Sequence, residues 1–221
     1  MLELNQLYCM DCNVGMKDFP DNYFDLAIVD PPYGLGNTNR YSKGKKSSIH
    51  KSFKWNDVVP DSKYFDELYR ISQNQIIWGC NYYTKYIPFC GRIIHNKILT
   101  DWSKGKNLSE CDLAAQSLNR KIEYFEYRWS GNVQGDNINW QNVGINKRIH
   151  PQQKPVQLYQ YCLKKYAKPD MKIIDTHVGS GSSIIAFLDF GCDWIGFEID
   201  KDYHKAATER IERHKQQLKL F

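Results

Sequence analysis

The sequence predicts a single α/β domain in which a mostly parallel, twisted sheet carries helices on both of its faces. The chain has 221 residues, a length that suits one domain of this class better than two. Hydrophobic residues make up 42% of the chain and charged residues 25%, a balance typical of a folded protein with a real core. Buried strand-like runs alternate with amphipathic helical runs, and this alternation is typical of parallel sheets flanked by helices.

Periodic apolar runs predict the individual elements, and capping residues predict where the helices begin. A helix is expected over 61–72 with Asp61 as its N-cap, and Pro155 suits the first turn of a later helix because its φ angle is fixed. Gly and Asn dominate 130–148, which predicts a surface loop. The other expected elements are strands at 25–30, 75–78, 92–96, 171–175 and 193–200, one or two strands within 111–129, and helices over 182–190 and 201–217.

The whole chain, 1–221, is expected to form this one domain. Two segments are set apart from the rest: 35–57 is expected to be a basic, mobile loop, and about 97–148 a short inserted region. There is no run of about 18 apolar residues, so no transmembrane helix is predicted. The start of the chain lacks the pattern of a signal peptide, so we expect a cytoplasmic location and no membrane partner.

The seven cysteines have irregular spacing, which predicts reduced thiols rather than a disulfide framework. Cys9 and Cys12 form a lone CxxC pair, whereas a zinc site would need two further ligands at a suitable spacing. The sequence therefore predicts no metal site.

Asp30-Pro31-Pro32-Tyr33 forms a stiff corner directly after a buried strand. Two consecutive prolines fix φ twice and remove two N–H donors, which leaves carbonyl oxygens pointing outward. An exocyclic amine of a nucleobase is a poor nucleophile because its lone pair is delocalised into the ring. Acceptors at its hydrogens, Asp30 Oδ and the Pro31 carbonyl, would draw the nitrogen toward a tetrahedral shape, while Tyr33 would stack on the base. Such a base must first be flipped out of the duplex.

A second turn, from Asp175 to Ser183, connects a strand to a helix, and the strand after that helix leads into Glu198. Glycines let a ligand approach the backbone, the helix N-terminus offers free N–H groups, and an acid after the next strand suits ribose hydroxyls. The third glycine of the dinucleotide pattern and the lysine of a P-loop are both absent. A nicotinamide cofactor stays open on this turn alone, whereas an ATPase is disfavoured.

Together, the Asp-Pro-Pro-Tyr corner, the later Gly-Ser-Gly turn, the run HPQQKP at 150–155 and the run WGCNYY at 78–83 resemble the DNA amino-methyltransferases. The corner precedes the glycine turn, as in the permuted class called β, and the likeness extends over nearly the whole chain. Small phage-type and solitary members are the most similar. The resemblance implies a Rossmann-like methyltransferase domain that transfers a methyl group from S-adenosylmethionine to a flipped base of double-stranded DNA.

The resemblance also implies roles for individual residues. An Asp before the two prolines usually accompanies adenine N6, whereas Ser usually accompanies cytosine N4, so Asp30 favours adenine and cytosine N4 is the alternative. The catalytic residues would be Asp30, Pro31, Pro32 and Tyr33. The methionine part of the cofactor would be bound by His177, Gly179, Ser180, Gly181 and Ser182. Glu198 would bind its ribose, and Asp11 and Cys12 would lie at its adenine. Asp175, the first residue of the turn, would also bind the cofactor, and Lys154 and Pro155 would close the pocket.

One departure from the family's pattern is Thr176-His177, where the family has Pro and Phe. We interpret His177 as a neutral ring packed in place of the Phe, with a role in activity as the alternative. A protein or RNA amine is a weaker candidate substrate, because the related protein enzymes carry Asn-Pro-Pro-Tyr after the cofactor motif. A catalytically silent DNA-binding relative is disfavoured by the intact Asp30 and Tyr33, and a nicotinamide oxidoreductase would leave the corner unexplained.

The net charge of +5 is unevenly distributed. The run from Arg40 to Lys54 has six basic residues and no acid, a composition that alone indicates a solvated loop. Because this run follows the catalytic corner, we expect it to contact phosphates beside a flipped base, through Arg40, Lys43, Lys45, Lys46 and Lys51. The range of about 97–148 would recognise a short or loosely specified target sequence. A homodimer and a partner restriction enzyme both stay open at this point.

Overall fold

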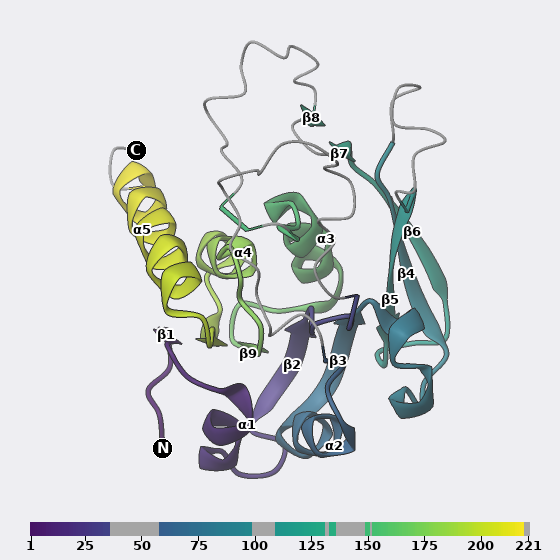
Figure 1. Ribbon diagram of the computed structural model, residues 1–221, viewed down its shortest axis with the longest axis horizontal. Helices are drawn as coiled ribbons and strands as arrows, with labels where there is room; N and C mark the ends of the chain where they lie inside the picture. The colour runs from purple at the N-terminus through teal and green to yellow at the C-terminus, as the bar shows by residue number, and fades with distance from the viewer. Residues whose placement is uncertain (36–57, 99–108, 131–132, 136–148, 151, 219–221) are drawn as a thin grey trace, which may run out of the picture.

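The computed structural model describes residues 1–35, 58–98, 109–130, 133–135, 149–150 and 152–218. These residues form an eight-stranded sheet with the strand order β1-β10-β9-β2-β3-β5-β4-β6 (Figure 1). Two short strands, β7 (Trp129–Ser130) and β8 (Val133–Gln134), pair with each other outside this sheet. The strands of the large sheet are β1 (Gln6–Tyr8), β2 (Phe24–Val29), β3 (Ser72–Trp78), β4 (Gly91–Asn96), β5 (Cys111–Gln116), β6 (Ile122–Glu126), β9 (Lys172–Asp175) and β10 (Asp193–Phe197).

All neighbouring strands of the large sheet pair in parallel except β5, which is antiparallel to both β3 and β4. The central strand β2 reads FDLAIV, and its last four residues are fully buried. A continuous apolar run of this kind is typical of a parallel strand that is covered on both faces.

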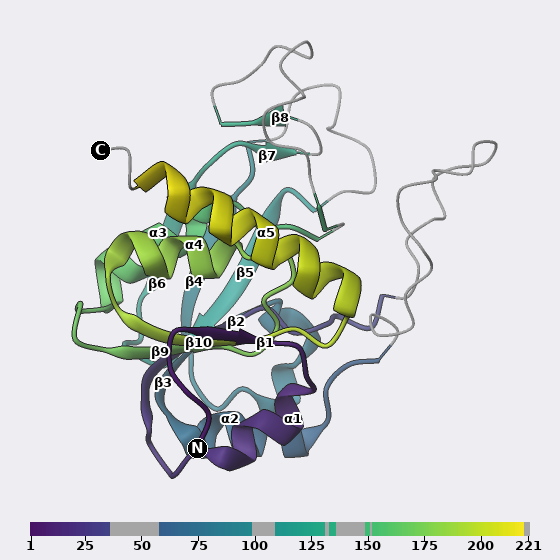
Figure 2. The same cartoon turned by 90° about the vertical axis from the view of Figure 1, so that its left-hand side faces the viewer.

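Helices cover both faces of the sheet (Figures 1 and 2). One core joins the sheet to the helices α3 to α5, and a second core joins its other face to α1 and α2. The predicted fold is confirmed by this arrangement. The helices are α1 (Cys12–Gly15), α2 (Ser62–Ile71), α3 (Val156–Tyr166), α4 (Ser182–Phe190) and α5 (Lys201–Leu218), with short 3-10 helices η1 (Met16–Asp18), η4 (Cys80–Tyr82) and η5 (Thr84–Tyr86).

Strands β2 and β9 are parallel neighbours in the middle of the sheet, with Leu26 opposite Ile173. Their carboxyl ends therefore lie at the same edge. From this pair the strand order continues through β3 on one side and through β10 on the other. Ligands of open α/β sheets bind at such a switch point, outside the carboxyl ends of the strands. The corner that starts at Asp30 and the turn that follows Asp175 both begin there.

Local signals in the sequence predicted most of these elements. Helix α2 begins after Asp61, whose carboxylate accepts a hydrogen bond from Tyr64 N at 3.3 Å, and α3 begins after Pro155. Helix α4 has the expected bounds. The sequence did not indicate β1 or α1, because elements of three and four residues carry too little periodicity to be recognised.

Two segments that the sequence set apart are described only in part. Of the range 97–148, β5 and β6 belong to the large sheet, and β7 with β8 forms a short hairpin where part of a surface loop was expected. Most of the remainder of that range, and 36–57, lie outside the described residues. No helix in the described part of the chain has the length and apolar character needed to cross a membrane.

Candidate active site

The corner after β2 places Asp30 in a network of three polar side chains. The Tyr33 hydroxyl donates a hydrogen bond to Asp30 Oδ1, and Lys154 Nζ donates to Asp30 Oδ2 at 2.8 Å. Lys154 Nζ also donates to the Tyr33 hydroxyl oxygen at 2.9 Å. Only 11% of the Asp30 side chain and 7% of the Lys154 side chain are exposed. Two donors from the protein itself therefore orient this carboxylate.

The carbonyl oxygens of the corner are bound by Tyr83, which follows η4. Its hydroxyl lies 2.5 Å from Pro31 O and 2.8 Å from Pro32 O. One O–H proton serves one oxygen at a time, and a carbonyl oxygen has two lone pairs, so Pro31 keeps a free acceptor site. Burial raises the pKa of Tyr83, which keeps the hydroxyl protonated as a donor.

The ring of Tyr33 packs against glycine and a second tyrosine. A Cβ at Gly79 would lie 2.1 Å from Tyr33 Cε1, and φ at Gly79 is +71°, so both space and backbone favour glycine. The Tyr82 ring stacks on Tyr33 with the centroids 4.8 Å apart and the planes 14° apart. Tyr82 is 39% exposed. A base that stacks on this face of Tyr33 must take the place of Tyr82.

The glycine turn after β9 is bound to the acid that follows β10. Gly179 N donates to Glu198 Oε2 and Asp200 N to Glu198 Oε1, both at 2.8 Å. Gly179 has φ +54°, and Gly181, with φ +78°, is the N-cap of α4. Both values lie in the left-handed region that favours glycine, so the sequence folds into this turn without strain.

Arg210 on α5 supports the same turn from another element. Its Nη1 donates to the Ser180 carbonyl oxygen and to Ser182 Oγ, both at 2.9 Å. Burial lowers the pKa of Arg210 to about 10, so the side chain is still a cation at neutral pH. No local pattern in the sequence indicates this contact, because it joins α5 to the turn and first residue of α4.

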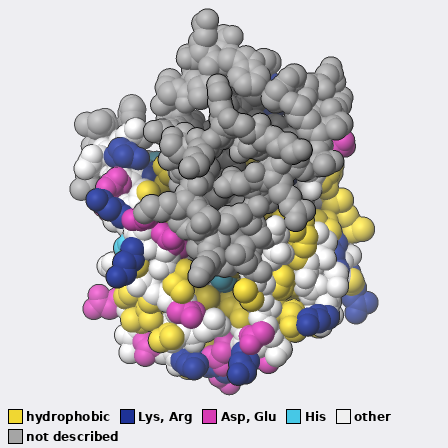
Figure 3. Space-filling view, in the orientation of Figure 1, with side chains coloured by type: hydrophobic (Ala, Val, Ile, Leu, Met, Phe, Trp, Pro, Cys, Tyr) yellow, Lys and Arg dark blue, Asp and Glu magenta, His cyan; other side chains and the backbone are white. Residues whose placement is uncertain are grey.

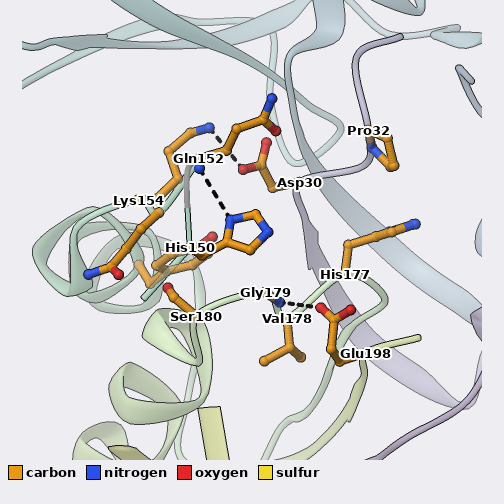
Figure 4. A pocket seen from close by; sticks show the side chains of 12 residues that line it. Asp30, Pro32, His150, Gln152, Lys154, His177, Val178, Gly179, Ser180 and Glu198 are labelled. Carbon is orange, nitrogen blue, oxygen red and sulfur yellow. Dashed lines mark hydrogen bonds and ion pairs between the residues drawn. The ribbon is translucent and has the colours of Figure 1, made fainter. Parts of the chain in front are cut away.

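A pocket separates the corner from the glycine turn (Figure 4). It has about 490 Å³ of empty space, open solvent at its mouth included. In Figure 4, Asp30 and Lys154 lie on one side, Gly179 and Glu198 on another, with His150 and His177 between them. The lining residues are Asp30, Pro32, His150, Gln152, Gln153, Lys154, Tyr159, His177, Val178, Gly179, Ser180 and Glu198.

Several ionisable groups at this pocket have shifted pKa values. Burial raises the pKa of Asp175, the last residue of β9, to about 7, and burial also raises the pKa of Glu198. Burial lowers the pKa of His177 to about 4, so its ring is neutral at neutral pH. Perturbed groups that gather at one pocket are typical of a functional site.

His177 is packed by residues from three elements. Its Nδ1 lies 2.9 Å from Thr176 Oγ1, and the Tyr64 hydroxyl lies 2.7 Å from that same oxygen. Its Nε2 lies 3.9 Å from Cys12 Sγ, and the Tyr64 ring meets it edge to face at 5.3 Å. These contacts fit a neutral ring in the position of the family's Phe, with one edge still lining the pocket.

The structure brings most of the predicted site residues together. Asp11 caps α1 beside Cys12 and His177, and Asp175 lies beneath the glycine turn. Lys154 lines the pocket but binds Asp30, a partner that the sequence did not indicate. The predicted residues that line the pocket are Asp30, Pro32, Lys154, His177, Gly179, Ser180 and Glu198, whereas Pro31, Tyr33, Asp11, Cys12, Asp175, Gly181 and Ser182 lie in the segments around it.

Other pocket residues were not predicted from the sequence. His150, Gln152 and Gln153 belong to the run HPQQKP that carried part of the resemblance, so a signal for them existed. Tyr159 lies on the first turns of α3, and Val178 lies inside the glycine turn. Among the residues that the structure describes, no cluster of three or more His, Cys, Asp or Glu side chains could hold a metal ion.

The expected DNA contacts at Arg40, Lys43, Lys45, Lys46 and Lys51 lie outside the described residues. On the described part of the face in Figure 3, Lys and Arg side chains alternate with Asp and Glu. This part of the surface therefore carries both signs of charge rather than a single basic patch.

Solved structures of other proteins share the Rossmann-like α/β fold of this chain. The chain matches M1.HpyAVI, solved as a SAM complex, with a TM-score of 0.56 and 17% sequence identity over 93% of this chain and 98% of that one. It matches the PvuII DNA methyltransferase, described as cytosine-N4-specific, with a TM-score of 0.57 and 13% identity over 98% of this chain and 93% of that one. At these identities the likeness concerns the fold.

The sequence comparison then gives the family. Residues 95–209, just over half of the chain, match the N6_N4_Mtase family, described as DNA methylase. The chain therefore belongs to this DNA methylase family. It is also 25% identical over 240 residues to the type II methyltransferase M.HpaI of Haemophilus parainfluenzae, across 94% of this chain and 74% of that one.

Proposed function

We propose that the protein transfers a methyl group from S-adenosylmethionine to the exocyclic amine of a flipped DNA base, with adenine N6 as the acceptor. The observation that carries this proposal is the pocket between the Asp30 corner and the Gly179–Glu198 turn, at the ends of adjacent parallel strands. A base inside a duplex cannot reach a carboxylate that is only 11% exposed, so flipping is part of the proposal.

The residues around the glycine turn fit S-adenosylmethionine. Each Glu198 oxygen accepts one backbone N–H and keeps a lone pair for a ribose hydroxyl. A Cβ on Gly179 would reach 3.6 Å from the His150 ring, so glycine keeps this part of the pocket open. The N-terminus of α4 adds backbone N–H groups that suit a carboxylate.

The corner's own residues would prepare the acceptor nitrogen. When bound, S-adenosylmethionine supplies a methyl group on a sulfonium sulfur, and that sulfur keeps the electron pair of the broken C–S bond. Asp30 and the Pro31 carbonyl accept the two amine hydrogens, which frees the nitrogen lone pair to form the new N–C bond. The nitrogen then loses one proton, for which the Asp30 carboxylate is the nearest acceptor.

Adenine is proposed over cytosine because Asp rather than Ser precedes the two prolines. Assignment to the permuted class β is supported by the corner at 30–33 preceding the turn at 175–183. Phosphate contacts by the basic run from Arg40 to Lys51, and target recognition within about 97–148, belong to the same proposal.

Nucleoside mass spectrometry of DNA treated with the purified protein and labelled S-adenosylmethionine tests this function. We expect N6-methyldeoxyadenosine, and mapping of modified bases on the same DNA gives the target sequence. Asp30→Asn, which keeps the shape but removes the charge, should slow methyl transfer by about 10²–10³-fold. Calorimetry of the same variant should give cofactor binding close to that of the wild type.

If the product is N4-methyldeoxycytidine, the acceptor is cytosine N4 and the proposal of adenine is wrong. Wild-type rates in Asp30→Asn would exclude the acceptor role of the carboxylate. Label that never enters DNA, in a sample that still binds S-adenosylmethionine, would favour the silent DNA-binding relative instead.

A further inference from the structure

Lys154 is a buried cation that comes from a distant part of the chain. It lies just before α3, 124 residues after Asp30, and only 7% of its side chain is exposed. Its Nζ reaches Asp30 Oδ2 at 2.8 Å and the Tyr33 hydroxyl at 2.9 Å. A buried ammonium is costly unless it is paired and hydrogen-bonded, so these two contacts define where it can lie.

The charges around Lys154 keep it protonated. Burial alone would lower the pKa of Lys154, but the carboxylates of Asp30 and Asp112 outweigh it and hold that pKa above its usual range. Asp112 on β5 is itself bound by His95 Nδ1 at 3.2 Å and by Lys97 Nζ at 3.0 Å. Two carboxylates therefore hold this ammonium in the corner across the whole physiological pH range.

We infer that Lys154 is a positioning residue of the methyl-acceptor site, where its ammonium group holds the Asp30 carboxylate aimed at the incoming amine. This inference rests on the proposed function of the pocket. Lys154 acts through Asp30 and takes no proton in the reaction, since it is already fully protonated. Its role differs from the closing of the cofactor pocket that the sequence predicted.

The hydrogen-bond geometry leaves room for the substrate amine. A carboxylate has about four lone-pair sites, and Tyr33 and Lys154 occupy one on each oxygen. Asp30 can therefore accept an amine hydrogen without losing Lys154. The ammonium fixes the carboxylate plane and its charge before the base arrives, and such preorganised acceptors avoid rearrangement during the reaction.

The link to Tyr33 separates this role from that of a simple structural ion pair. Lys154 binds both the carboxylate that would accept the amine and the hydroxyl of the ring that would stack on the base. One cation therefore sets the position of the two groups that a flipped base would meet. Its charge should matter most for Asp30, because a charge-assisted hydrogen bond to a carboxylate is shorter and stronger than a neutral one.

The test compares the maximal rate of single-turnover methyl transfer at saturating cofactor with the affinity for cofactor, in the intact protein and with a DNA duplex that contains the mapped target. Lys154→Gln removes the charge but keeps a hydrogen-bond donor, and Lys154→Arg keeps the charge. Lys165→Gln is the matched control, because Lys165 lies on α3 and pairs with Glu123 at 2.8 Å, away from Asp30.

The maximal single-turnover rate should fall by about 10²-fold in Lys154→Gln, because a carboxylate that is no longer held in place meets the amine less often in the reactive geometry. The rate should return to within about three-fold of the wild type in Lys154→Arg and should stay there in Lys165→Gln. Cofactor affinity should change less than about three-fold in all three variants.

A wild-type rate in Lys154→Gln, or a loss of rate that comes with an equal loss of cofactor affinity, would overturn the inference. Weaker cofactor binding with an unchanged maximal rate would return Lys154 to the cofactor pocket. If Lys154→Gln does not fold, Lys154→Arg decides, because a rate that falls by about 10²-fold although the charge is kept would overturn the argument. A wild-type protein that never methylates DNA would instead refute the proposed function, on which the inference rests.

Discussion

The buried carboxyl of Asp175 makes the stability of the free protein depend on pH. Asp175 ends β9, is fully buried, and accepts a hydrogen bond from His177 N at 3.0 Å. Burial raises its pKa from 3.8 to about 7. Between these values the folded state binds a proton that the unfolded state does not, so the stability from this group is full at acid pH and is lost as pH rises to about 7.

The substitution Asp175→Asn removes the charge and keeps the shape and the acceptor for His177. A shift of about three pKa units corresponds to about 4 kcal/mol at about 1.36 kcal/mol per unit, which is an upper value for the cost of the charge above pH 7. If the variant recovers half of it, its melting temperature at pH 8 should rise by about 4–8 °C, at about 2–4 °C per kcal/mol for a chain of this length.

Thermal melts of the free wild type and Asp175→Asn between about pH 4 and pH 8.5 measure this effect. The difference in melting temperature should be small near the unfolded-state pKa of 3.8, should grow steadily in favour of the variant as pH rises, and should level off above about pH 7. Cofactor affinity should change in the opposite sense, because an ionised Asp175 attracts a sulfonium cation and the variant cannot. A difference in melting temperature that does not vary with pH, or a wild type that is more stable at pH 8, would refute this reasoning.

Two further substitutions test supports of the pocket. Arg210→Met removes the donor to the Ser180 carbonyl and the Ser182 hydroxyl, so cofactor affinity measured by calorimetry should fall about ten-fold. The control is Arg213→Met, at an exposed position of the same helix, which should leave cofactor affinity unchanged. Tyr82→Ser removes the ring that stacks on Tyr33, so a flipped base should enter this place more easily. The fluorescence of 2-aminopurine at the target position should therefore increase, with a flipped fraction about 2–10-fold higher. Weaker fluorescence would mean that Tyr82 itself binds the base.

Local sequence patterns were sufficient to predict the frame of this site. The corner at 30–33 and the turn at 175–183 each follow a buried strand, and the resemblance to the DNA amino-methyltransferases implied that one binds the base and the other the cofactor. The parallel pairing of β2 with β9 then places them at one edge of the sheet. A pattern of strands and helices predicts such edges well, because parallel strands in one sheet point the same way.

Contacts between distant segments were not predictable in the same way. The Lys154–Asp30 pair joins residues 124 positions apart, and the hydrogen bond from Tyr83 to the Pro31 carbonyl joins residues 52 apart. Both depend on where α3 and η4 pack, which periodicity does not encode. A motif names the residue types that a site needs, whereas tertiary packing decides which of them touch.

The protein already binds each of the two acceptors at the corner with a donor of its own. Tyr83 binds the Pro31 carbonyl, and Tyr33 and Lys154 bind Asp30, yet every acceptor keeps at least one free lone pair. An acceptor without such partners could rotate or take up a proton, and an amine would then have to reorganise it. The orienting donors come from three segments: Tyr33 from the corner itself, Tyr83 from the residue after η4, and Lys154 from just before α3. The geometry around the amine therefore depends on the packing of the whole sheet edge rather than on one loop. Substitutions that loosen this packing should therefore slow methyl transfer more than they weaken cofactor binding.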